Sequence, residues 1–558
     1  MREAKSTLPE FKWSGELYGL AADHWADGRN RRGNSQSGRM IGARFPLQRN
    51  QAWISLAILG FGLCLAWSLG DWIAAGNTQS IMYAALAVAF CAIVVTVLRD
   101  WRTGSYAFLV WLLFEDLVRK YMGNNMAIYF GKDVLVAIVY LSFFISVRAQ
   151  KTKLFRPPFR LFLSLFFWLG VLECFNPNSP SVFYGILGLK LYFYYIPLMF
   201  VGYALIETHS DLRRFLTFNM SLAGLISLLG IIQAIVGVSF LNPRVLAPEI
   251  RELSNVYRYS PITGQMVFRP SSVFVSDGRF AWYLTMVWLI GLGSVGYLVL
   301  RRERQTVVFV GTALVAVAAM LCGSRGTVVF IAASSFVVAA AFLWGSPWRR
   351  EGGHRLLKAI RRGFIAAGIG VVIAVVLFPV AIGARWSFYS ETLDPRSSES
   401  ELGFRAMDYP IAEFQKAFPQ TNWVYGDGIG TASLGMQYVS RILGQASTNF
   451  GVESGYGNLF IEFGTIGLLL WLLWTAAVVM ASWKVVLRVR QTSVFPIAFA
   501  MCWFIFLLLF PMTFASIGPY ENYIYNAYLW LSVGILFRLP ALVARQGGVS
   551  SPAERHIG

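Results

Sequence analysis

Basic residues that could bind an anion recur at the predicted ends of apolar segments. Arg325 stands in the run GSRG (323–326) between two apolar stretches, and Arg269 closes a long polar loop. Arginine binds phosphate through paired, charge-assisted hydrogen bonds, so guanidinium groups gathered at one water boundary suit a phosphate or diphosphate headgroup. The expected ligand is an anionic lipid. The residues that we expect to form the site are Lys190, Arg269, Arg279, Arg325 and Arg405.

A simpler explanation applies to each of these residues taken singly. Arg and Lys at the ends of membrane helices often extend to ordinary lipid headgroups, and an Arg in a tight turn can bind helix-end carbonyls. Their positions in the sequence leave both alternatives open.

A carboxylate is the second feature that could do chemistry. Glu453 lies just before the apolar run that starts near residue 458. A carboxylate beside an apolar boundary can have a raised proton affinity, which suits a general base that accepts a proton from a sugar hydroxyl. The alternative is a cap or first-turn acid that complements a helix dipole. Glu462, two turns further along, is expected to pair within the helix bundle.

Other catalytic chemistries lack the residues they need on the same side of the membrane. All four histidines fall in predicted cytoplasmic loops or tails, and the five cysteines lie in apolar segments without a CxxC spacing. A Ser-His-Asp or Cys-His nucleophile and a His-ligated metal are therefore not expected. The chain also has neither a P-loop nor a G-x-S-x-G motif. We expect metal-free catalysis by Arg and a carboxylate, without a cofactor.

The composition places these residues in a membrane protein. The 558 residues are 56% hydrophobic and 14% charged, far from the roughly 25% charged residues of soluble domains. The formal charge of +19 comes mostly from Lys and Arg in segments that alternation places in the cytoplasm. This follows the positive-inside bias, so we expect no nucleic-acid partner.

Apolar runs of about 20 residues predict an all-α polytopic protein with about fourteen transmembrane helices. The third run, 103–114, is short and is followed by four charged residues, which predicts a re-entrant or interfacial helix. Both termini are expected in the cytoplasm. The predicted parts are a flexible tail over 1–50, eleven helices over 51–384 with an exterior loop at 242–278, a large exterior loop or small helical cap over 385–457, three helices over 458–540 and a tail over 541–558.

The order of several short motifs resembles the O-antigen ligase and polymerase superfamily. GSRG (323–326) is followed by GFR (403–405), GDGIG (426–430) and ESGYGNLFIEFGTIGLLL (453–470). The stretch 267–284 is loosely similar to the segment that precedes the following span in that family. The resemblance covers about 260–480.

The resemblance implies a metal-independent glycosyltransferase of the bacterial inner membrane that uses undecaprenyl-diphosphate-linked oligosaccharides on the outer side. The acceptor hydroxyl would attack the anomeric carbon with inversion, and the lipid diphosphate would leave. Arg325 and Arg405 match the arginines of the family's motifs and would hold the diphosphate. Membrane lipid and a chain-length regulator or export protein are the further partners implied.

One departure from the family pattern bears on the reaction. Ligases of the family carry a catalytic histidine at the start of the last motif, where this chain has Glu453. We therefore favour a polymerase that joins lipid-linked repeat units into an exopolysaccharide or O-antigen chain. A ligase that transfers glycan to another acceptor is one alternative. A transporter or flippase of lipid-linked sugars is another, although transporters place ionisable groups near the bilayer midplane.

Overall fold

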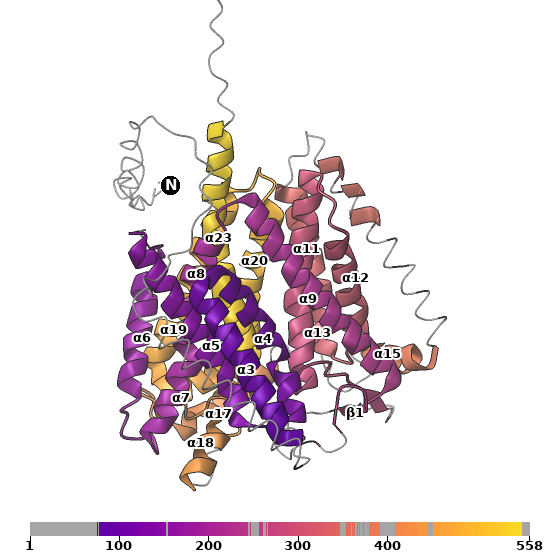
Figure 1. Ribbon diagram of the computed structural model, residues 1–558. Coiled ribbons are helices and arrows are strands. Elements are labelled where there is room, and N and C mark those ends of the chain that lie inside the picture. The colour runs from indigo at the N-terminus through magenta and orange to yellow at the C-terminus, as the bar shows by residue number, and fades with distance from the viewer. Residues whose placement is uncertain are drawn as a thin grey trace, which may run out of the picture. The chain divides into compact units, whose positions relative to one another are not determined.

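The structure, a computed structural model, describes residue 75, residues 78–345 except short stretches near 152 and between 244 and 265, parts of 353–390, and residues 408–444 and 450–549 (Figure 1). The chain divides into a unit of residues 1–65 and a unit of residues 66–558, and every element below belongs to the second. Four predicted features lie outside the described residues: the tail 1–50, the first apolar run near 52–70, Arg405 and the last residues of the C-terminal tail.

Among the described residues, eight helical segments are long and apolar enough to cross a membrane. The prediction of an all-α, multi-pass membrane protein is confirmed at this level. The segments are α5 (Met126–Ala149), α7 with α8 (Val182–Phe193 and Leu198–Leu205), α9 (His209–Val236), α11 (Asp277–Arg301), α13 (Arg325–Gly345), α19 (Gly455–Arg488), α20 with η5 and α21 (Phe495–Leu507, Leu508–Met512 and Thr513–Ala515) and α23 (Tyr523–Val549).

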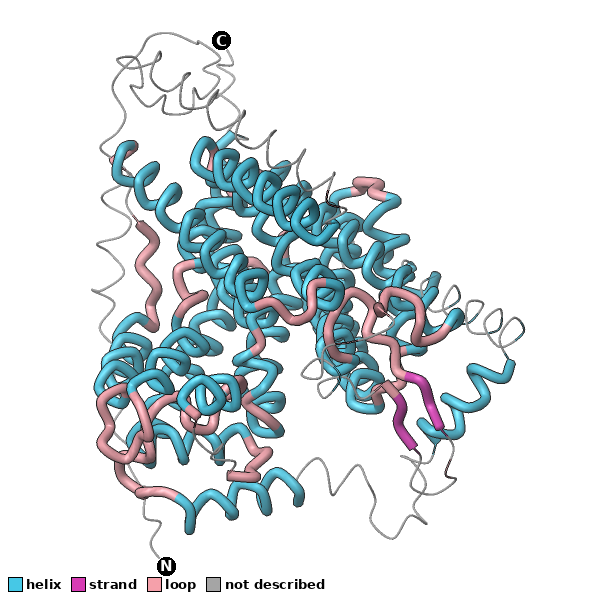
Figure 2. The backbone as a smooth tube through the Cα atoms, turned by 60° about the horizontal axis from the view of Figure 1, so that its bottom comes forward, coloured by secondary structure: helices cyan, strands magenta, loops and turns pink. Residues whose placement is uncertain are grey.

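Shorter elements complete the described fold. Helices α3 (Thr78–Arg99) and α12 (Thr306–Leu321) are apolar but shorter in their apolar part, and β1 (Tyr257–Tyr259) pairs antiparallel with β2 (Met266–Phe268), the magenta strands of Figure 2. The others are α4 (Trp101–Tyr121), α6 (Arg160–Glu173), α15 (Pro379–Ser390), α17 (Tyr409–Ala417), η4 (Phe418–Gln420), α18 (Met436–Leu443) and α22 (Gly518–Glu521).

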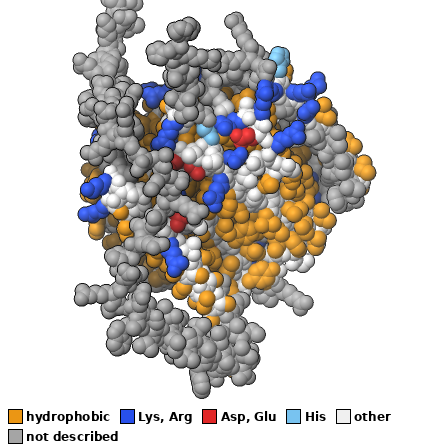
Figure 3. All heavy atoms as spheres, turned by 45° about the horizontal axis from the view of Figure 1, so that its top comes forward, with side chains coloured by type: hydrophobic (Ala, Val, Ile, Leu, Met, Phe, Trp, Pro, Cys, Tyr) orange, Lys and Arg blue, Asp and Glu red, His pale blue; other side chains and the backbone are white. Residues whose placement is uncertain are grey.

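Small residues bring the central helices together. A side chain at Gly293 of α11 would lie 2.7 Å from the Ala500 side chain of α20, and one at Gly202 of α8 would lie 2.6 Å from the Leu531 carbonyl of α23. Membrane helices associate through such close packing because lipid gives no hydrophobic drive between them. Large side chains such as Phe336 remain exposed, and hydrophobic side chains cover a broad area of the face in Figure 3.

The GDGIG motif belongs to an inserted loop, residues 421–434, that lies between α6, α7 and α19. Ile429 is fully buried, close to Gly170 of α6 and Gly188 of α7. Gly426, like Gly428 and Gly430, has a positive φ, a backbone conformation that glycine adopts readily. The described part of 385–457 contains the helices α17 and α18, as expected for a helical cap. The inserted loop of the same segment, however, packs between helices of the bundle.

A break in α19 makes room for the inserted loop. Gly464 has φ 62° and ψ −163° inside the helix, and a side chain there would lie 2.7 Å from the Tyr425 nitrogen. The backbone hydrogen bonds continue through the loop, because the Thr465 N–H donates to the Trp423 carbonyl at 2.8 Å and the Asp427 N–H donates to the Ile461 carbonyl at 2.7 Å.

Gly464→Ala should therefore destabilise the protein. Because alanine must adopt a strained φ and push against the loop backbone, we expect a loss of about 2–4 kcal/mol, measured by thermal unfolding in detergent. Gly383→Ala is the matched control, since a side chain at Gly383 of α15 meets no atom within 4 Å and its φ is ordinary. Equal unfolding temperatures for the two variants would contradict this account of the break.

Candidate functional site

Four arginines gather at the turn between α12 and α13, and we call them the arginine cluster: Arg258, Arg269, Arg325 and Arg385. Arg269 pairs with Asp277 at 2.7 Å, and Asp277 also interacts electrostatically with Arg258 of β1. Arg325 opens α13. In Figure 1, β1 and α15 lie together at the lower right, beside the lower ends of α12 and α13.

The turn itself, residues 322–324, permits this approach. Gly323 has φ +67°, and a side chain there would lie 2.9 Å from the Cγ atom of Arg269. Only glycine accepts both the left-handed backbone and the close contact easily. The Ser324 hydroxyl accepts a hydrogen bond from the Thr327 N–H at 3.4 Å, which supports the first turn of α13. The GSRG run thus places Arg269 against the turn that directly precedes Arg325.

Helix α15 supplies two residues that hold the cluster together. The Arg385 Nε donates to the Leu321 carbonyl at 3.1 Å, and its Nη2 donates to the Phe268 carbonyl at 3.3 Å. The Arg325 guanidinium lies over the Phe388 ring, 3.9 Å from its centroid. Stacking on an aromatic face restricts the orientation of a guanidinium. The sequence did not identify Arg385 as a site residue. Its only distinguishing feature there is its position directly after an apolar run.

The structure places Arg279 and Lys190, both predicted for the same site, in a second cluster of charges. The Arg279 Nη1 contacts both Asp116 oxygens, at 2.9 and 2.8 Å, and the Lys190 Nζ contacts Asp133 at 2.6 Å. We call this cluster the ionic network, and its members are Glu115, Asp116, Arg119, Lys120, Lys132, Asp133, Lys190 and Arg279.

The ionic network and the arginine cluster share the segment 269–279. The Lys120 Nζ donates to the Ser271 hydroxyl at 3.0 Å and to the Ser272 carbonyl at 2.9 Å. Arg269 belongs to the arginine cluster, and Arg279 belongs to the network. The four charged residues after the third apolar run are buried in α4, because partners on α5, α11 and this segment bond to them. Their helix is therefore packed against its neighbours in the bundle.

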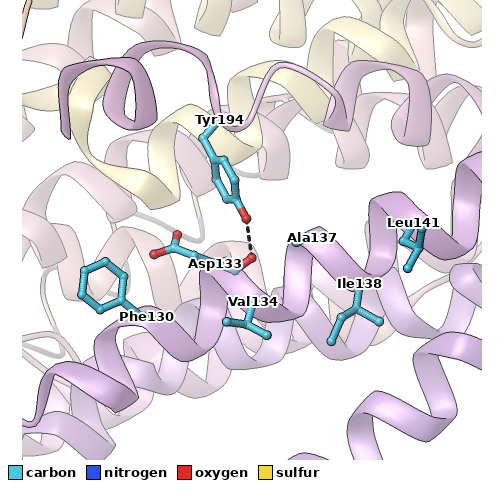
Figure 4. A pocket seen from close by; sticks show the side chains of 7 residues that line it. All are labelled: Phe130, Asp133, Val134, Ala137, Ile138, Leu141 and Tyr194. Atoms are coloured by element: carbon cyan, nitrogen blue, oxygen red, sulfur yellow. Dashed lines mark hydrogen bonds between the residues drawn. The ribbon is translucent and has the colours of Figure 1, made fainter. Parts of the chain in front are cut away.

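A cavity of about 350 Å³ opens beside the Asp133 end of the network. Figure 4 shows its lining, in which Tyr194 donates a hydrogen bond to the Asp133 carbonyl and the rest of the wall is mainly apolar side chains of α5. An apolar wall of this kind suits a hydrocarbon chain. Its lining residues are Phe130, Asp133, Val134, Ala137, Ile138, Leu141 and Tyr194.

Glu453 is exposed and stands directly before α19. The cap of that helix is Ser454, whose side chain accepts from the Gly457 N–H, so the capping role falls to the neighbouring residue. The Glu453 N–H donates to Glu413 at 3.0 Å, and Glu413 also bonds to Lys416. Although burial opposes its ionisation, these hydrogen bonds lower the pKa of Glu413. The contacts described for Glu453 include no arginine.

Two buried carboxyls that the sequence did not mark as a site lie at the end of the inserted loop. Glu462 of α19 and Glu521 of α22 accept hydrogen bonds from residues 432–434. Glu462 was expected to pair within the bundle, and its described partners are the loop backbone, Ser433 and Tyr192 of α7. Comparison of the chain with protein-family models and with curated proteins finds no match.

Proposed function

We propose that this protein is a membrane glycosyltransferase that polymerises lipid-linked oligosaccharide repeat units, with an undecaprenyl-diphosphate-linked glycan as donor. The observation that carries the proposal is the arginine cluster at the end of α12 and α13. Arg269 there pairs with Asp277, which also interacts electrostatically with Arg258, while Arg385 donates to backbone carbonyls and Arg325 stacks on Phe388. Such a group of fixed donors suits a diphosphate, whose charge grows as it leaves the sugar.

In the proposed reaction, the cluster binds the diphosphate of the donor and stabilises its developing charge. Arg325 is the main contact, because its stacking on Phe388 restricts the guanidinium. Arg269 is held by Asp277 and contributes a second positive group. The acceptor sugar hydroxyl loses its proton to Glu453, and its oxygen attacks the anomeric carbon while the lipid diphosphate departs with the bonding pair. Arg405, by the motif resemblance, completes the diphosphate site.

The remaining parts of the proposal concern topology and partners. We propose about fourteen spans, a bacterial inner-membrane location with both termini in the cytoplasm, and a site on the outer side capped by 385–457. Arg279 and Lys190, being paired within the ionic network, support the segment 269–279 and the apolar cavity. Chain-length and export proteins are the proposed protein partners.

Glu453→Gln should stop chain growth and leave single repeat units on the lipid carrier. Loss of a general base commonly costs about 100-fold to 10,000-fold in rate, and Glu453→Asp should retain part of the activity. The measurement is the mass and chain length of lipid-linked glycans extracted from cells that depend on this chain. Lys416→Ala, which alters the neighbouring Glu413 pair, controls for a local change in structure.

Other outcomes of the same experiment would replace the proposal. Full-length polymer that lacks only its final attachment would indicate a ligase. Repeat units retained on the cytoplasmic side would indicate a transporter. Normal polymer at normal protein level would remove Glu453 from the reaction.

A further inference from the structure

Glu462 and Glu521 come from different helices and meet at the same three residues of the inserted loop. Glu462 is fully buried and Glu521 is 3% exposed. The Glu462 Oε1 accepts from the Ser433 hydroxyl at 2.6 Å and from the Ala432 N–H at 3.0 Å. The Glu521 Oε2 accepts from the Leu434 N–H at 2.6 Å. Consecutive loop residues thus bring the two carboxyls side by side.

Each carboxyl has a second oxygen that lies outside these loop hydrogen bonds. These atoms are the Oε2 of Glu462 and the Oε1 of Glu521. The buried Tyr192 hydroxyl of α7 lies beside both carboxyls and can donate its one proton to either of them. Because one hydroxyl proton can serve only one of the two carboxyls, an oxygen of the other is left without a donor, which is costly in a buried site.

The surroundings supply no positive charge to this pair. The titratable groups that face the carboxyls are Tyr192 of α7 and Tyr520 of α22, besides the carboxyls themselves. Neither carboxyl forms an ion pair with a described Lys, Arg or His. Two adjacent buried carboxylates cannot both stay charged without a counter-charge, because desolvation and mutual repulsion favour the neutral form of one.

We propose that Glu462 and Glu521 form a buried proton-binding site, which holds one proton between their carboxyls beside the Tyr192 hydroxyl and fastens the inserted loop to α19 and α22. The proton joins the two carboxyls by a hydrogen bond, while their other oxygens hold the loop N–H groups. When the proton leaves, the like charges repel, and the loop loses two of its anchors. This site does not depend on glycosyl transfer.

The site predicts a definite direction of pH dependence. Burial, with the Glu462 charge nearby, raises the pKa of Glu521 from 4.5 to about 8. The folded protein therefore holds a proton that the unfolded chain releases at lower pH. The stability from this proton is complete below about pH 4.5 and is lost progressively as the pH rises through about 8.

The test uses the purified full chain in lipid nanodiscs, and its first readout is the unfolding temperature between about pH 5 and pH 9. We expect the wild type to become less stable toward high pH, and Glu521→Gln and Glu462→Gln to flatten that dependence, because each amide is neutral at every pH. Glu413→Gln is the matched control, since Glu413 is a buried carboxyl paired with Lys416, and it should keep the wild-type high-pH decline.

Infrared spectra of the same wild-type sample provide a readout that does not require a variant to fold. The carbonyl band of a protonated carboxyl should be present near pH 6 and disappear as the pH rises. Absence of that band, or an unchanged high-pH decline in both Gln variants, would overturn the proposal. A rise in unfolding temperature at high pH with sodium, but not with potassium or choline at equal ionic strength, would also overturn it by indicating a metal cation.

Discussion

Replacing Arg325 by alanine is expected to lower glycosyl transfer by about 100-fold, because removal of one preorganised donor commonly costs that much where charge develops in the transition state. Arg325 opens α13 beside Arg269, and Phe388 restricts its guanidinium. The loss should appear mainly in kcat, since the diphosphate charge is greatest as the bond breaks. The measurement is the rate of polymer formation from purified lipid-linked repeat units in nanodiscs.

Two further variants make this result specific. Arg325→Lys keeps the charge but not the planar group, so it should recover only part of the rate. Arg301→Ala removes a guanidinium at the opposite end of α11, where it pairs with Glu303 at 2.9 Å, and should leave the rate unchanged. If Arg325→Ala and Arg301→Ala were equally active at equal protein level, the arginine cluster would have no part in the reaction.

Replacing Asp116 by alanine is expected to destabilise the protein by about 3–5 kcal/mol, the usual effect of removing one partner from a buried ion pair. The Asp116 carboxylate is 1% exposed, contacts Arg279 through both oxygens and contacts Arg119 at 3.4 Å. Its removal leaves the buried guanidinium of Arg119 and the partly buried one of Arg279 without this counter-charge. Thermal unfolding in detergent, followed by tryptophan fluorescence, measures the loss.

A surface ion pair offers the matched control. Glu207 pairs with Arg102, and their side chains are 36% and 34% exposed. Because water already screens such pairs, Glu207→Ala should cost no more than about 1 kcal/mol. A similar small loss for Asp116→Ala would show that the ionic network does not support the fold.

The features that could be predicted from the sequence are those that depend on the residues of a single segment. Runs of about 20 apolar residues are a strong mark of a membrane helix, and eight helical segments of the described residues are long and apolar enough to cross a membrane. The GSRG run also predicted a tight turn with Arg325 at its end, because glycine permits the backbone that the turn requires. The structure places Arg269 at the same turn, as expected for a residue at the end of the loop 242–278.

Contacts between distant segments could not be predicted in this way. Arg279 and Lys190 resemble Arg269 in their positions along the sequence, yet their partners, Asp116 and Asp133, lie on α4 and α5. Those pairs depend on how the helices pack. The insertion of the loop at Gly464 could not be predicted either, because it also depends on how distant segments pack. The sequence shows only a glycine in an apolar run, and its unusual φ is known from the structure alone.

Affinity measurements test most directly whether the arginine cluster binds a lipid diphosphate. Undecaprenyl diphosphate and undecaprenyl monophosphate should be compared on the purified protein in nanodiscs, with wild type, Arg325→Ala and Arg301→Ala side by side. We predict that the diphosphate binds the wild type more tightly than the monophosphate, and that Arg325→Ala weakens diphosphate binding at least about tenfold, equivalent to about 1.4 kcal/mol, while Arg301→Ala does not. Equal diphosphate affinity in all three proteins would contradict the claim.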